Sequence, residues 1–101
     1  GQEALLATLS PLPPPPDDPT NGVADDPDAA TLGQRLFFDP GLSGSGEFAC
    51  ASCHQPEGGF GDGLVVSDTV APTPRHAPTL WNNAYNRWFN WDGRCDTAWC
   101  Q

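Results

Sequence analysis

The spacing of apolar positions predicts one helix directly after an acidic stretch. Leu32, Leu36 and Phe37 recur at helical spacing and share one face. Asp28 can cap the N-terminus of this helix, and Pro40 ends it because the residue before a proline disfavours helical geometry. Period-two alternation is scarce elsewhere in the chain. The sequence therefore predicts a mainly α, loop-rich fold.

Prolines and aspartates dominate the first 27 residues. Pro13–Pro16 is uninterrupted, and acidic pairs follow at Asp17–Asp18 and Asp25–Asp26. This composition favours an extended, polyproline-like conformation over a packed core. We expect residues 1–27 to form an extended arm, as a linker or a strap across a larger body, and residues 28–101 to form the domain.

Short helical segments are expected within the domain. Residues 50–54 are predicted to form a helical turn after a Gly/Ser loop, and residues 55–77 are predicted to form a loop. Thr79–Ala84 is predicted as a short helix. Asp96 can cap another helix that starts at Thr97.

The segment Cys50-Ala51-Ser52-Cys53-His54 has the Cys-x-x-Cys-His pattern that attaches a c-type haem. Each thiol can form a thioether with one vinyl group of the porphyrin, and the histidine can bind the iron as its proximal ligand. Three alternatives are weaker. The glycine-rich surroundings do not fit a thioredoxin-like dithiol, no second Cys-x-x-Cys pair completes a zinc ribbon, and a plain Cys50–Cys53 disulfide leaves His54 without a purpose. The sequence predicts one covalently bound haem c.

The charge balance is strongly acidic, with thirteen acidic residues against four basic ones and a formal net charge of −9. Such a surface repels nucleic acid and anionic membranes. Solubility explains the charge, and steering of a basic redox partner is the functional alternative.

Features relevant to location point outside the cytoplasm. No stretch approaches 18 uninterrupted apolar residues, so no membrane span is expected. The first residues lack a charged and apolar leader, as expected of a mature chain whose export signal has been removed. Since haem c attachment in proteins of this kind takes place outside the cytoplasm, we expect a periplasmic or extracellular protein.

Six ordered motifs, covering about residues 20–101, resemble a known family. They are Leu32-Gly33-Gln34-Arg35-Leu36-Phe37-Phe38-Asp39-Pro40, Leu42-Ser43-Gly44, Cys50-x-x-Cys53-His54, Gly59-Phe60-x-Asp62-Gly63, Arg75-His76-Ala77-Pro78-Thr79-Leu80 and Trp91-Asp92-Gly93-Arg94. Together they resemble the N-terminal, peroxidatic haem domain of bacterial diheme cytochrome c peroxidases and their methylamine-utilisation relatives.

This resemblance implies a cytochrome c-like single-haem domain and a role for each matching residue. Cys50 and Cys53 correspond to the thioether anchors, and His54 to the proximal ligand. Trp91 corresponds to a tryptophan between two haems, where electron relay and packing on the porphyrin both remain open. Gln101 corresponds to a glutamine that faces the peroxide side of the iron. The other matched positions implied to contact the cofactor are Phe38, Pro78, Leu80 and Arg94.

Departures from the family pattern leave the iron's sixth ligand open. The sequence has no methionine, which excludes His/Met ligation within it. His76 is either a sixth ligand or a loop residue that donates to backbone or to a haem propionate. Many relatives have an asparagine there, in a calcium-associated position, which weakens the case for calcium. One Cys-x-x-Cys-His motif, where the family has two, predicts part of a larger protein or assembly.

Cys95 and Cys100 form a second cysteine pair. In one continuous helix their Cα atoms would lie roughly 8 to 9 Å apart, beyond the ~7 Å limit for a disulfide. With Asp96 as N-cap, the two cysteines occupy positions that touch in a hydrophobic staple. A local disulfide is favoured over free thiols or links to another chain.

Two functions follow from these observations. The enzymatic hypothesis is reduction of hydrogen peroxide, with electrons arriving through Trp91 from a second haem domain or a donor cytochrome. The alternative is a single-haem electron-transfer protein, or a subunit of a larger cytochrome assembly, with no substrate of its own.

Overall fold

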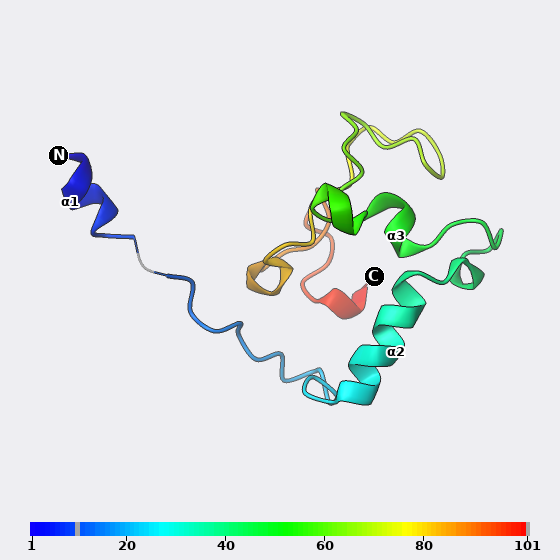
Figure 1. The fold of residues 1–101 in the computed structure, drawn as a ribbon, viewed down its shortest axis with the longest axis horizontal. Helices are drawn as coiled ribbons and strands as arrows, with labels where there is room; N and C mark the ends of the chain where they lie inside the picture. The colour runs from blue at the N-terminus through cyan, green and yellow to red at the C-terminus, as the bar shows by residue number, and fades with distance from the viewer. Residues whose placement is uncertain (10, 101) are drawn as a thin grey trace.

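The computed structural model describes residues 1–9 and 11–100 (Figure 1). Over these residues the regular structure is helical, with two isolated β-bridges and no strand. The mainly α, loop-rich character predicted from the sequence agrees with this. The elements are α1 (Gln2–Leu6), α2 (Pro27–Phe37), α3 (Cys50–Cys53) and the 3-10 turns η1 (Pro40–Leu42), η2 (Pro56–Gly58), η3 (Asn83–Tyr85) and η4 (Ala98–Cys100).

Helix α2 begins earlier than predicted, because its cap is Asp26 and not Asp28. The Asp26 carboxylate accepts the backbone N–H groups of Asp28 at 2.8 Å and Ala29 at 3.3 Å. Pro27 occupies the first turn, where its missing N–H costs nothing and its fixed φ suits the helix. The sequence-based choice of Asp28 was wrong because the aspartate before a proline at the first helical position is the better cap.

The first residues differ from the expected extended arm. Gln2–Leu6 forms the short helix α1, whose residues are good helix formers in a stretch free of proline. From Pro11 onward the chain runs without regular structure toward α2, and α1 lies far from the other helices (Figure 1). The Tyr85 hydroxyl donates to the Pro13 carbonyl at 2.5 Å. This bond fastens the proline segment beside η3.

The described chain is open in shape. Its radius of gyration is 16.5 Å, against about 13 Å for a compact domain of 100 residues. Among the described residues, Cys95 is the only buried hydrophobic residue, and Ser67 is the only buried polar one. All four tryptophans are between 53% and 64% exposed. The apolar side chains therefore surround a cavity and do not close into a solid core.

Two predicted helices near the C-terminal end are replaced by single turns. The predicted helix Thr79–Ala84 is wrong, because Asn82 adopts a left-handed backbone (φ +59°) and only the turn η3 follows. The helix predicted from Thr97 is the 3-10 turn η4, closed by a bond from the Cys100 N–H to the Thr97 carbonyl at 3.3 Å.

Residues 62–76 form a loop that projects from the body (Figure 1). Ser67 lies at its centre: the Ser67 hydroxyl donates to Asp62, and the Ser67 N–H donates to the Arg75 carbonyl at 3.0 Å. The hydrogen bond from Ser67 lowers the pKa of the Asp62 carboxyl. Thr73 closes the other side through its N–H and hydroxyl, each 3.0 Å from the Ser67 carbonyl.

Candidate haem site

A cavity of about 640 Å³ lies between α3, residues 78–80 and the turns that follow. Its volume falls within the range of cofactor pockets, about 300–1,000 Å³. The lining residues are Phe37, Ala49, Cys50, Cys53, His54, Pro78, Thr79, Leu80, Asn83, Asn86, Trp88, Phe89, Asn90, Trp91 and Ala98. Residues 49–54 are called the attachment wall below, and residues 88–91 with Ala98 the disulfide wall.

Helix α3 presents both thiols of the attachment wall to the cavity. The Ala49 N–H donates to the Ser52 hydroxyl at 3.0 Å, which satisfies a backbone donor at the start of the helix. The His54 N–H donates to the Cys50 carbonyl at 3.0 Å and closes the turn. Cys50 and Cys53 are both free thiols. One helical turn therefore carries two unpaired sulfurs and a histidine to the same cavity.

The His54 ring is held by the backbone of the next turn. Its Nδ1 lies 3.0 Å from the Phe60 carbonyl, which can only accept, so Nδ1 donates this bond, and in the neutral ring the lone pair is then on Nε2. Phe60 adopts φ +59°, uncommon for a bulky residue, within the turn that presents this carbonyl. A backbone acceptor of this kind fixes the tautomer of histidines that bind metals.

Aromatic contacts connect this turn to its neighbours. The Phe60 ring meets Phe37 of α2 at 6.1 Å and Trp81 at 5.4 Å between ring centroids, both edge to face. The Thr79 hydroxyl donates to the Gly59 carbonyl at 2.5 Å. These contacts bring α2, the turn after α3 and residues 79–81 together at the cavity.

Trp91 lines the cavity and packs against His76. The Trp91 indole N–H donates to the His76 carbonyl at 2.9 Å, and the two ring centroids lie 4.9 Å apart, edge to face. Within the described residues, His76 contacts Trp91 but is not part of the cavity lining.

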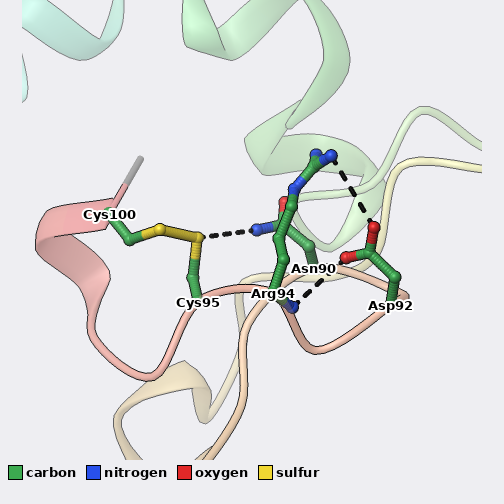
Figure 2. The surroundings of a disulfide bond; sticks show 5 residues. All are labelled: Asn90, Asp92, Arg94, Cys95 and Cys100. Carbon is green, nitrogen blue, oxygen red and sulfur yellow. Dashed lines mark hydrogen bonds and ion pairs between the residues drawn. A yellow bond between two sulfur atoms is a disulfide. The ribbon is translucent and has the colours of Figure 1, made fainter.

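A disulfide between Cys95 and Cys100 braces the disulfide wall (Figure 2). Their Cα atoms lie 5.6 Å apart, within the usual range for a disulfide. The local pairing favoured from the sequence is therefore present. Asn90 donates from its side-chain nitrogen to the Cys95 sulfur at 3.2 Å, as Figure 2 shows.

The cavity lining contains six of the ten residues predicted from the sequence, and Phe38, Arg94 and His76 lie outside it. Its lining includes Cys50, Cys53, His54, Pro78, Leu80 and Trp91. Phe38 borders a separate depression with Gly33 and Pro56. Arg94 is exposed and pairs with Asp92 at 3.7 Å. Gln101 lies outside the described residues.

Sequence reasoning missed the asparagines of the cavity. Asn83, Asn86 and Asn90 lie outside the motif residues taken as cofactor contacts, and no local pattern marks them. Phe37 and Thr79, by contrast, stand inside quoted motifs and could have been found as neighbours of Phe38 and Pro78.

The residues of the attachment wall fit a covalently bound haem. Two free thiols and one histidine with an oriented Nε2 border an apolar cavity, which is the donor set that thioether attachment and axial ligation need. No cluster of three or more side chains suited to hold a metal ion by themselves occurs in the described part of the chain.

A cavity bordered by a Cys-x-x-Cys-His turn is typical of c-type haem domains. The sequence profile of the di-haem cytochrome c peroxidase family matches residues 27–101. The chain belongs to this family.

Individual relatives agree with the family match. The chain is 47% identical over 73 residues to the methylamine utilization protein MauG of Methylorubrum extorquens, covering 70% of this chain and 21% of that protein. It is 41% identical over 100 residues to the cytochrome-c peroxidase IdrP2 of Pseudomonas sp. strain SCT, covering 97% of this chain and 25% of that protein. The chain thus spans about a quarter of the length of these relatives.

A solved structure shares the fold. The crystal structure of a MauG-like protein associated with microbial copper homeostasis superposes with a TM-score of 0.69 at 38% identity, over 82% of this chain and 24% of that one. No helix in the described ranges is long and apolar enough to cross a membrane.

Proposed function

We propose that this chain is the peroxidatic haem c domain of a periplasmic or extracellular diheme peroxidase. The observation that carries the proposal is the attachment wall, where Cys50, Cys53 and His54 border one cavity. A haem bound there supplies iron redox chemistry and a site for peroxide. Reduction of hydrogen peroxide to two waters consumes two electrons and two protons.

The attachment wall would hold the haem. Cys50 and Cys53 would form the thioethers to the porphyrin, and the His54 Nε2 would bind the iron. The Phe60 carbonyl accepts a hydrogen bond from the His54 Nδ1, which keeps the ring oriented. Pro78 and Leu80 line the same cavity and would pack against the macrocycle.

Trp91 relays electrons to this cavity. Its bond to the His76 carbonyl fixes the plane of the indole, and its 53% exposure leaves a surface that a second domain can contact. One residue can therefore border the cavity and meet an electron-delivering partner. Phe38 and Arg94, which lie outside this cavity lining, and Gln101, which lies outside the described residues, are further contacts proposed from the family resemblance alone. By that resemblance the Gln101 carboxamide would hydrogen-bond peroxide. His76 acts in this scheme as the support of Trp91.

A second haem domain, or a donor cytochrome, delivers the electrons. The relatives are about four times longer than this chain and include cytochrome-c peroxidases, which supports a further domain in the same protein. The acidic surface favours a basic donor.

The test is electron delivery in the complete haem-loaded protein, comparing wild type with Trp91→Phe. Phenylalanine keeps an aromatic side chain at the cavity but removes the indole. We expect the absorption spectrum of the haem in Trp91→Phe to match that of wild type. The rate of peroxide reduction with a reduced donor should fall at least tenfold. Equal rates would contradict the relay. A low-spin spectrum that ignores cyanide, without peroxide turnover, would instead support the electron-transfer protein.

A further inference from the structure

In the disulfide wall, the Asn90 side chain is hydrogen-bonded to a sulfur of the disulfide, next to the cavity. Asn90 lines the cavity and donates to the Cys95 Sγ at 3.2 Å. Cys95 is only 4% exposed, so this sulfur is a fixed, buried acceptor. The bond is weak by the standard of oxygen acceptors, but the disulfide leaves the sulfur little freedom to move.

Three backbone features set the position of Asn90. Asn90 has φ +62°, a left-handed conformation that asparagine tolerates better than most residues. The Gly93 N–H donates to the Asn90 carbonyl at 3.1 Å, and the Phe89 N–H donates to the Cys95 carbonyl at 2.8 Å. The turn therefore closes on Cys95 through both its backbone and its sulfur.

The other end of the disulfide lies in a second part of the same wall. Cys100 ends the turn η4, and Ala98 of that turn lines the cavity. The bond from the Cys100 N–H to the Thr97 carbonyl lies within this turn and does not attach it to residues 88–91. The disulfide is thus a covalent link between the two segments of the disulfide wall (Figure 2).

We propose that the Cys95–Cys100 disulfide is a positioning device that holds the Asn90 carboxamide against the haem. Asn90 is then a cofactor-contacting residue that tunes the electrostatics of the iron, and the disulfide acts only through it. This inference rests on the proposed haem site, and it adds a tuning residue and its covalent support.

The proposal is tested by whether the effects of changing Asn90 and of removing the disulfide on the midpoint potential add up. Two changes that act through one contact are not additive. The complete haem-loaded protein is prepared as wild type, Asn90→Ala, Cys95→Ala/Cys100→Ala and the triple variant. Haem content is measured first, by the pyridine haemochrome spectrum, and the midpoint potential of the iron is then titrated in each. Absence of covalent haem in the wild type would contradict the proposed function itself.

We expect Asn90→Ala and the double cysteine variant to shift the potential in the same direction. The triple variant should shift no further than Asn90→Ala alone. Additive shifts, or an unchanged potential in the double cysteine variant, would overturn the proposal while the haem site stands.

Asn86 provides a matched control. It is another asparagine of the cavity, but its side-chain nitrogen donates to Asn83 at 2.9 Å and not to the disulfide. Asn86→Ala should therefore combine additively with the cysteine changes. If Asn86→Ala is also non-additive, the disulfide acts on the whole cavity and the specific role of Asn90 is wrong.

A chemical route gives the same comparison if the double cysteine variant does not accumulate. A phosphine reductant cleaves the disulfide of the purified protein to two thiols and becomes the phosphine oxide, taking its oxygen from water. Iodoacetamide then caps the thiols, and the iron is reoxidised before titration. The potential should change in wild type and stay constant in Asn90→Ala. A change of equal size in both would contradict the proposal.

Discussion

The two walls of the cavity are built in different ways. The attachment wall is one helical turn whose bonds join residues at most six positions apart, such as the contact of His54 with Phe60. The disulfide wall has no regular helix beyond η4 and depends on a sulfur–sulfur bond and on positive φ values at Asn90 and Gly93. In the proposed haem site the first wall would carry the bonds to the cofactor, and the second would carry aromatic and amide contacts. Attachment would then depend on one helical turn, while tuning would depend on a disulfide.

The largest effect should come from removing the thiols of the attachment wall. Cys50→Ala/Cys53→Ala removes both thioether donors, so we expect complete loss of covalent haem. A haem stain after denaturing electrophoresis measures this, with Cys95→Ala/Cys100→Ala as the control that keeps its stain. Retained stain in the first variant would contradict attachment at Cys50 and Cys53. Loss of stain in the second would show that covalent haem needs Cys95 and Cys100.

His54→Gly separates attachment from ligation within the same wall. The thioethers can still form, but the proximal ligand and its bond to the Phe60 carbonyl are lost. We expect the haem to stay covalently attached and its Soret band to change strongly, and added imidazole to restore it. His76→Gly is the matched control and should preserve the spectrum. An unchanged spectrum in His54→Gly would rule out proximal ligation.

Removing the Cys95–Cys100 disulfide should lower the stability of the folded state moderately. Closing a loop this short stabilises the folded state by about 2 kcal/mol at most. We expect Cys95→Ala/Cys100→Ala to lower the free energy of unfolding by up to this amount, measured in urea on haem-loaded protein. A much larger loss would mean that the two walls do not fold independently of each other.

The smallest effect should come from a change at Ser67, in the loop outside both walls, and should be limited to the pKa of Asp62. Ser67→Ala removes the donor that lowers the pKa of Asp62, so the Asp62 pKa should rise toward its ordinary value. Because the folded state favours the ionised carboxylate, its stabilisation is present above the unfolded pKa and is lost as the pH falls through the lower folded value. Carbon-13 NMR titration of the carboxyl checks this shift.

A change at Thr20, in the proline-rich segment before α2, is the control for the effect of Ser67→Ala on Asp62. Thr20 lowers the pKa of Asp18 by hydrogen bonding, so Thr20→Val should raise the Asp18 pKa and leave Asp62 unaffected. A shift of both carboxyls in either variant would point to a change of fold.

The comparison of the walls also shows what the sequence could predict. The turn Cys50–His54 and the helix around Leu36 were predictable because their patterns are local. The Cys95–Cys100 pair was favoured correctly, although the expected α-helix is a 3-10 turn. Asn82 and Asn90 were unpredictable, because a left-handed backbone at one residue depends on contacts made by the rest of the chain.

The scarcity of buried apolar side chains affects how the protein responds to dilution. A protein that obtains its core from a reversibly bound ligand gains stability with the ligand concentration, and it loses that stability when the ligand is diluted away. Haem joined to Cys50 and Cys53 as proposed removes this concentration dependence, because the cofactor cannot leave. Refolding then starts from a chain that still carries the apolar group around which Phe37, Leu80 and Trp91 assemble.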